Sequence, residues 1–317
     1  MPNIINLEHQ SVRDLAWVMD SPGLLSKNNT EALAPVEDQW CKKVSLSAWK
    51  WLQSLDKNPK ELDDWLLSKK CSRLGDYFAF LVEFWLMKWF KVEKLVSSQQ
   101  IFDENRTVGE FDFLFYSEEI KRDSHWEVSV KFYLQSKNEG SLNVFIGPNA
   151  WDSLYKKFDK VLNQQIKLKE NSSARTWLDE NDYASLHSQF FFKGYLFYPV
   201  NNSCCQQNDL PEEVAPNHLK GWWCHYPLTS ESRSFLLRNR VKAKWYVLPK
   251  EEWLSPVVKS IDDPHILDGE KQLFNALEEY FFEKERPLMI VEMASMNKIK
   301  LCERTRGFIV PEIWPGV

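Results

Sequence analysis

Four charged residues on two nearby segments have the types and spacing for metal-assisted chemistry. Glu110 and Asp112 lie on the first segment, and Glu127 and Lys131 lie on the second. Three carboxylates on one small patch repel one another, and Mg²⁺ relieves that repulsion because it prefers carboxylate and water oxygens. A lysine beside them can orient a water molecule or stabilise charge that develops on a phosphate. If the segments meet, these residues indicate metal-assisted phosphodiester hydrolysis.

Both segments alternate apolar and polar residues, which is typical of β-strands. In residues 109–116 one face carries phenylalanines and the other carries the acids: Phe111, Phe113 and Phe115 against Glu110, Asp112 and Leu114. In residues 125–132 the two faces are Trp126, Val128, Val130 and Phe132 against His125, Glu127, Ser129 and Lys131. The polar link 117–124 predicts an antiparallel hairpin whose aromatic and β-branched face packs into the core. We expect His125 to be a hydrogen-bonded surface histidine.

Two registers of this hairpin gather the charges on one face. A turn at the middle of the link places Asp112 opposite Ser129 and Glu110 opposite Lys131, whereas a shift by two residues places Asp112 opposite Glu127. Opposed side chains lie roughly 4.5–5.5 Å apart at Cβ, so either register makes a compact patch. A plainer interpretation is a solvated charged face closed by an ion pair between Glu110 and Lys131.

The run Gly109-Glu-Phe-Asp112 followed by Trp126-Glu-Val-Ser-Val-Lys131 resembles the PD-(D/E)XK nuclease superfamily, over about residues 73–170. Most of the chain is also similar to an uncharacterised bacterial family, the domain-of-unknown-function 1853 family. The phrases that carry this second similarity include Arg73-Leu-Gly75, His125-Trp-Glu127, Lys131-Phe-Tyr-Leu134, Gly147-Pro-Asn149, Gly221-Trp-Trp223 and Arg306-Gly-Phe308.

The nuclease resemblance implies that Asp112 and Glu127 hold Mg²⁺ or Mn²⁺, that Glu110 assists and that Lys131 orients water. It also implies that Glu83, on the preceding helix, supplies a further acid. The sequence departs from the superfamily pattern at one position. The lysine usually lies two residues after the acid, where this chain has Ser129; Lys131 comes four residues after, about 13 Å along a strand. That departure leaves open a site that binds without catalysing.

The most basic helix of the chain is expected over residues 150–169, directly after the hairpin. Its polar side is rich in lysine, and the candidates for contact with nucleic-acid phosphates are Lys156, Lys157, Lys160 and Gln164. The nuclease resemblance implies this contact for Lys157 and Gln164 in particular. A merely solvated lysine face is the alternative.

The remaining periodicities predict an α/β protein with a mixed β-sheet flanked by helices and a restriction-endonuclease-like core. We expect an N-terminal helical segment at 1–70, the nuclease-like core at 71–200, and a C-terminal α/β part at 201–317 packed on the core. A buried helix at 73–93 precedes the hairpin. Further strands are expected at 142–146, 191–197, 221–225, 244–248 and 288–293, with a helix at 268–283.

Composition narrows the class of protein. The net charge of −5 is mild evidence against a broadly basic nucleic-acid surface, although one local helix can supply phosphate contacts. No apolar run is long enough to cross a bilayer, and the six cysteines show no CxxC spacing. We therefore expect a cytoplasmic protein with reduced thiols.

The leading hypothesis is an Mg²⁺-dependent nuclease acting on DNA or RNA. The alternative is an inactive module of nuclease fold that binds nucleic acid or a protein partner. The sequence indicates no oligomeric state.

Overall fold

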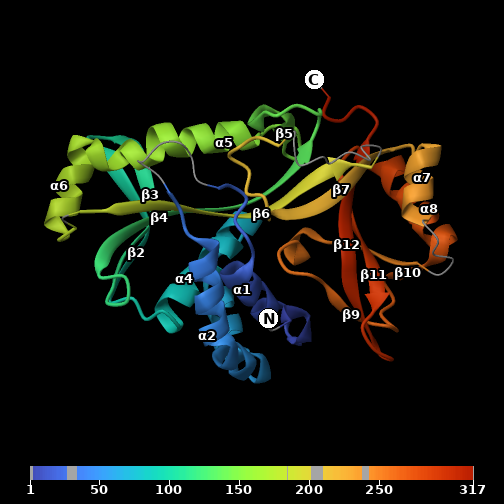
Figure 1. Cartoon of the computed structure of the whole chain (residues 1–317), viewed down its shortest axis with the longest axis horizontal. Coiled ribbons are helices and arrows are strands. Elements are labelled where there is room, and N and C mark those ends of the chain that lie inside the picture. Colours follow the sequence, from blue (N-terminus) through green and yellow to red (C-terminus); the bar gives the residue numbers. More distant parts are fainter. Residues whose placement is uncertain (1–2, 27–33, 184, 201–209, 238–242, 317) are drawn as a thin grey trace.

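A mixed β-sheet runs the length of the protein in the computed structural model, which describes residues 3–26, 34–183, 185–200, 210–237 and 243–316 (Figure 1). The longer strands are β2 (Lys94–Asp103), β3 (Arg106–Ser117), β4 (Arg122–Gln135), β6 (His187–Pro199), β7 (Leu219–Tyr226), β11 (Leu288–Ser295) and β12 (Lys300–Pro311). The shorter strands are β1 (Ala34–Pro35), β5 (Phe145–Ile146), β8 (Lys244–Val247), β9 (Val258–Ser260) and β10 (Ile266–Asp268). Their spatial order is β10-β8-β11-β12-β7-β6-β4-β3-β2, and β1, β5 and β9 attach to β6, β4 and β12. The β4–β6, β6–β7 and β7–β12 pairs are parallel, and the pairs toward both ends of this order are antiparallel.

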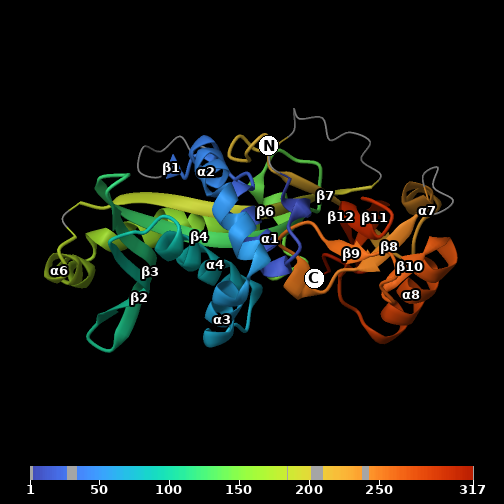
Figure 2. The same cartoon turned by 90° about the horizontal axis from the view of Figure 1, so that it is seen from below.

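Helices cover both faces of this sheet. The first face is covered by α1 (Gln10–Asp20), α2 (Asp38–Lys57), α3 (Lys60–Ser68) and α4 (Leu74–Lys88), which lie over the middle of the sheet in Figure 2. The second face carries α5 (Leu154–Lys160), α6 (Ser172–Glu180), α7 (Ser230–Leu237) and α8 (Gly269–Glu283). The predicted α/β class, with a mixed sheet flanked by helices, is confirmed.

The alternation of β4 separates two cores. Trp126, Val128, Val130 and Phe132 pack with the N-terminal helices, as predicted. The expected face of Phe111 was wrong: its ring packs edge-on against His125, with centroids 5.0 Å apart, on the opposite side from Phe113 and Phe115. β3 begins to pair with β4 only at Phe113, so Phe111 precedes the paired stretch in which the alternation holds.

The segment after β4 departs from the predicted elements. Of the strand expected at 142–146, only Phe145–Ile146 pairs with β4, because Leu142–Val144 forms a 3-10 turn, η2. The expected helix at 150–169 begins only at Leu154, where the Ser153 hydroxyl accepts the Lys156 N–H at 3.3 Å. It continues as a π-helical turn, η3 (Val161–Gln165), and a 3-10 turn, η4 (Ile166–Glu170). Residues 147–152 form a loop instead.

The sheet, and the core beneath the N-terminal helices, continue past the predicted domain boundary between residues 200 and 201. Residues 201–209, which follow that boundary directly, lie outside the described part of the chain. β6 precedes that boundary and β7 follows it, yet the two strands pair directly. The core beneath the N-terminal helices draws on residues from Leu7 to Trp314. The N- and C-terminal parts therefore share one packed interior.

Candidate functional site

A cleft of about 1090 Å³ opens where β3 leaves β4. The last residue pair between these strands is Phe113 with Trp126, and β5 joins the same edge of β4 only at Leu134. Among the described residues, no strand pairs with Val128–Tyr133 on that edge. The carboxyl group of Asp112 takes the place of the missing strand, since its Oδ2 accepts the Val128 N–H at 2.9 Å.

Of the two candidate metal ligands, Asp112 lines the cleft, whereas Glu127 is fully buried and is not part of the cleft lining. The Phe113–Trp126 pair selects the second of the two predicted registers, which sets Asp112 beside Glu127. The two acids are close enough for the charge of Glu127 to act on Asp112. Oε2 of Glu127 is buried and receives no hydrogen from any donor in the described part of the chain. Two carboxyl groups in this position need either a shared proton or a cation between them.

Burial controls the titration of both acids. Burial, together with the charge of Glu127, raises the pKa of Asp112 to about 7. Burial raises the pKa of Glu127 to about 8, against the opposing charge of Lys157. Near neutral pH the pair therefore holds protons that a cation would displace.

A buried histidine orients Glu127. His125 Nε2 lies 2.9 Å from Glu127 Oε1, and its Nδ1 lies 3.1 Å from the Ser188 hydroxyl on β6. His125 is fully buried, so the expectation of a surface histidine was wrong. Burial lowers its pKa to about 4, which keeps the imidazole neutral. A neutral imidazole can donate one hydrogen to Glu127 while it accepts one from Ser188.

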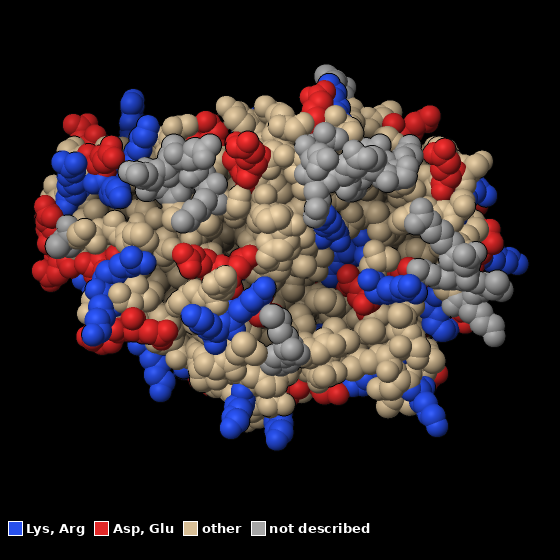
Figure 3. All heavy atoms as spheres, viewed as in Figure 1, with Lys and Arg blue, Asp and Glu red and all other residues tan. Residues whose placement is uncertain are grey.

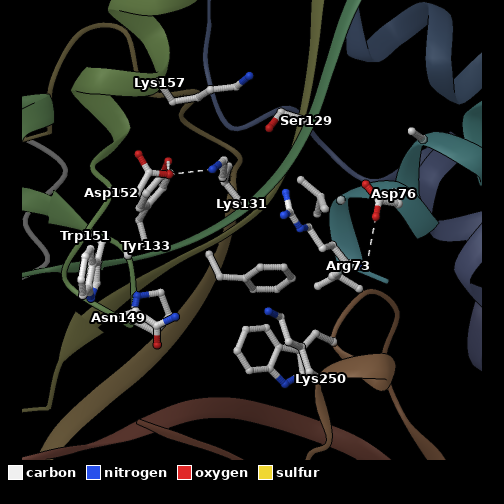
Figure 4. Close-up of a pocket in the computed structure, with 18 of the residues that line it drawn as sticks. Arg73, Asp76, Ser129, Lys131, Tyr133, Asn149, Trp151, Asp152, Lys157 and Lys250 are labelled. Atoms are coloured by element: carbon white, nitrogen blue, oxygen red, sulfur yellow. Dashed lines mark hydrogen bonds and ion pairs between the residues drawn. The ribbon is translucent and has the colours of Figure 1, made fainter. Parts of the chain in front are cut away.

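The cation that faces the carboxyl pair comes from α5. Lys157 is half-buried in the cleft, where burial lowers its pKa and the charges of Asp112 and Glu127 oppose that shift. Lys131 also lines the cleft, but its amine donates to Asp152 Oδ2 at 2.6 Å. Figure 4 shows this ion pair beside Tyr133, with Lys157 reaching in from α5. Lys157 rather than Lys131 is thus the lysine whose charge acts on both acids.

The other residues predicted for the site differ in whether they reach the cleft. Glu110 lines the cleft and contributes to the field at Glu127. Glu83 does not line it; its oxygens are occupied by Lys69 at 3.0 Å and Ser97 at 2.9 Å. The three remaining candidates for phosphate contact are exposed and lie outside the cleft lining: Lys156, Lys160 and Gln164.

Further cations line the cleft on elements that the sequence did not connect with the hairpin. Arg73 precedes α4, Lys250 lies on the 3-10 turn η6 (Lys250–Glu252), and Arg286 follows α8. Figure 4 places Arg73 and Lys250 across the cavity from Lys157. Figure 3 shows acidic and basic side chains interspersed over the face that it presents. That face therefore presents no broad basic surface.

The number of carboxyl groups in the pair matches the number that Mg²⁺ commonly uses. Within the described ranges, no three His, Cys, Asp or Glu side chains form a metal-binding group. Mg²⁺ keeps several water ligands and is commonly held by one or two carboxylates together with substrate phosphate, so two acids suffice.

None of the helices in the described part of the chain is long and apolar enough to cross a membrane.

A family model described as a domain of unknown function (DUF1853) matches residues 13–310, so the chain belongs to that family. No curated protein and no solved structure matches the chain.

Proposed function

We propose that this member of the DUF1853 family hydrolyses phosphodiester bonds of nucleic acid with Mg²⁺ or Mn²⁺, on a core of the restriction-endonuclease type. The observation that carries the proposal is the pair of the half-buried Asp112 and the fully buried Glu127, in which Glu127 Oε2 has no hydrogen-bond partner among the described residues. An uncompensated buried carboxylate is costly unless it is protonated or bound to a cation.

Asp112 and Glu127 are the residues that would hold the cation. The Val128 N–H fixes the orientation of Asp112, and His125 fixes that of Glu127. Such support from neighbouring groups is usual around metal ligands. When bound, the cation would act as a Lewis acid toward the phosphate and provide a nucleophile at neutral pH.

Lys157 would bind the phosphate and balance the negative charge that develops on it. Its amine is partly desolvated, which strengthens its interaction with an anion in the cleft. Lys131 has a different task, since its ion pair with Asp152 ties β4 to the 147–152 loop. In this arrangement Lys157, on the helix that follows the hairpin, supplies the charge that the superfamily takes from a lysine on the strand. The strand position of that lysine can then be occupied by Ser129.

A second candidate function is binding without hydrolysis, in which the same cleft holds a nucleic-acid backbone. The engagement of Lys131 with Asp152 favours this candidate, because the strand lysine then makes no contact with the acids. Binding of this kind depends strongly on salt concentration.

A cleavage assay separates the two functions. Purified protein with Mg²⁺ or Mn²⁺ is mixed with single- and double-stranded DNA and RNA, and products are resolved by electrophoresis. We expect metal-dependent cleavage that Asp112→Ala abolishes. Lys157→Ala should slow cleavage about 100-fold or more, a size typical of losing one preorganised charge at a reaction centre.

Lys156→Ala is the matched control, because Lys156 is the exposed neighbour on the same helix and lies outside the cleft lining. It should keep the wild-type cleavage rate within about twofold. Cleavage of none of the four substrates would refute the hydrolysis proposal, and salt-sensitive binding alone would favour the second candidate.

A further inference from the structure

Trp151 stands apart from the tryptophans that build the core. Its side chain is 89% exposed, whereas Trp85 and Trp126 are among the largest fully buried side chains. It lies on the 147–152 loop, one residue before Asp152, which binds Lys131. Figure 4 shows the indole at the rim of the cleft, beside Asn149. An indole left in water beside a charged cleft is a feature of recognition surfaces rather than of packing.

Hydrogen bonds constrain the backbone of the loop that carries this indole. Gly147 N–H donates to the Asp152 carbonyl at 2.8 Å, and Ala150 N–H donates to the Gly147 carbonyl at 2.8 Å. The indole N–H of Trp314 donates to the Pro148 carbonyl at 2.9 Å, which ties the loop to the C-terminal segment. Ala150 adopts a φ of +61°, a conformation that is uncommon for alanine and turns the chain sharply before Trp151.

A slot of about 490 Å³ opens on the other side of this loop. Its apolar walls include Pro148, Ile313 and Trp314, and Glu285 and Arg286 supply its charges. Trp151, Asn149 and Arg286 line both the slot and the cleft, so the two spaces are adjacent. A strand that passes these residues can therefore reach both spaces.

We propose that the slot binds an unpaired nucleobase, stacked on Trp151, of a single strand whose backbone runs past Arg286 into the cleft. This inference rests on the proposed function, since it names the substrate class of the same site. A flat apolar wall accepts the face of any base, and stacking of this kind tolerates sequence. The amide of Asn149 offers a donor and an acceptor to a base edge. Bases within a duplex are already stacked on their neighbours and paired, so a duplex gains nothing from the slot.

Equilibrium binding in EDTA tests the inference without requiring hydrolysis. The probes are fluorescently labelled 15-nucleotide single strands of DNA and RNA, together with the matching DNA duplex, followed by anisotropy. We expect wild-type protein to bind at least one single strand more tightly than the duplex. Trp151→Ala should weaken single-strand binding about tenfold and leave duplex binding within twofold. Trp151→Phe should recover most of the loss, since phenylalanine keeps a stacking face.

Phe282→Ala is the matched control, because Phe282 is 91% exposed and lines neither space. It should bind as wild type does. Equal single-strand affinity of wild type and Trp151→Ala, an equal loss for the duplex, or no binding to any probe would overturn the inference. Trp151-dependent binding without metal-dependent cleavage would refute the hydrolysis and keep the base slot. Cleavage that Trp151→Ala leaves unchanged, with unchanged binding, would refute the slot alone.

Discussion

At the scale of single residues, the site depends on how little water reaches two adjacent carboxyl groups. Burial raises the pKa of Asp112 to about 7 and that of Glu127 to about 8. In the unfolded chain both groups ionise near pH 4. Between that pH and 8 the folded protein therefore binds protons that the unfolded chain has released, so the free energy of unfolding falls as pH rises.

The window from pH 6.5 to 8.5 contains most of this effect, because the lowered pKa values of His125, His187 and His218 act on stability mainly below about pH 6.5. Without divalent cations, we expect the free energy of unfolding to fall by about 2 kcal/mol across the window. Glu127→Gln should remove most of that fall, since the amide keeps the geometry without the charge. Urea denaturation at several pH values measures it, and a flat wild-type profile would contradict the assigned burial of the pair.

The sequence predicted both acids from their alternation and named Lys157 only through the nuclease resemblance. Alternation places Asp112 and Glu127 on one face in both predicted registers, but only the observed Phe113–Trp126 pair sets them opposite each other. The position of Lys157 depends on where α5 begins and how it crosses the sheet, which is a matter of tertiary packing. Lys156 and Lys157 look equivalent in the sequence, yet one is exposed and the other enters the cleft. Trp151 carried no local signal either, because exposure is not visible in residue type.

At the scale of elements, the close approach of β6 to β4 fixes the strand that carries the site. Gly194 on β6 pairs with Lys131 and has a φ of +137°, a conformation that L side chains rarely adopt. A Cβ at Gly194 would lie 1.8 Å from the Lys131 carbonyl oxygen. Any side chain there must push β4 away, and with it the edge that lines the cleft.

We therefore expect Gly194→Ala to lower the free energy of unfolding by about 3 kcal/mol. Gly75→Ala is the contrasting variant, because a Cβ at Gly75 in the first turn of α4 meets nothing within 4 Å. It should raise that free energy by up to about 1 kcal/mol through helix propensity. Chemical denaturation compares the two, and equal stability of both variants would contradict the described packing of β4 against β6.

Helices and strands whose apolar residues repeat regularly along the sequence were predictable. Elements whose form depends on tertiary contacts were not. The strands around Phe113 and Trp126 were predicted because one face of each is buried. β2 was not predicted, because it lies at the end of the sheet and most of its side chains are half-buried or exposed, so it lacks a clear apolar face. The 147–152 loop replaced the start of a predicted helix because its own backbone hydrogen bonds close it.

At the scale of the whole molecule, one core beneath the N-terminal helices joins the ends of the chain. Leu7 and Trp314 belong to the same apolar cluster, and the pairing of β6 with β7 and of β7 with β12 carries the sheet into the C-terminal part. Arg306 on β12 reinforces the junction: it is fully buried, binds Glu303, and donates to the carbonyls of Trp253 and Ser255 next to η6. Lys250 and Arg286, which line the cleft, thus belong to the C-terminal part of the chain. That part cannot move away from the N-terminal part without exposing the shared core to water.

We expect the protein to unfold in one cooperative transition. Tryptophan fluorescence and far-ultraviolet circular dichroism, recorded against urea, should give coincident curves, because both parts lose the shared core together. Two separated transitions would mean that the C-terminal part folds independently of the cleft.

Binding of a divalent cation by Asp112 and Glu127 is the central claim, and Mn²⁺ titration followed by electron paramagnetic resonance at pH 8 tests it most directly. We expect one Mn²⁺ site on wild-type protein that Asp112→Asn and Glu127→Gln each remove. Binding should be weaker at pH 6, where protons occupy the pair. Wild-type protein that binds no Mn²⁺, or variants that bind it as wild type does, would contradict cation binding by these two acids.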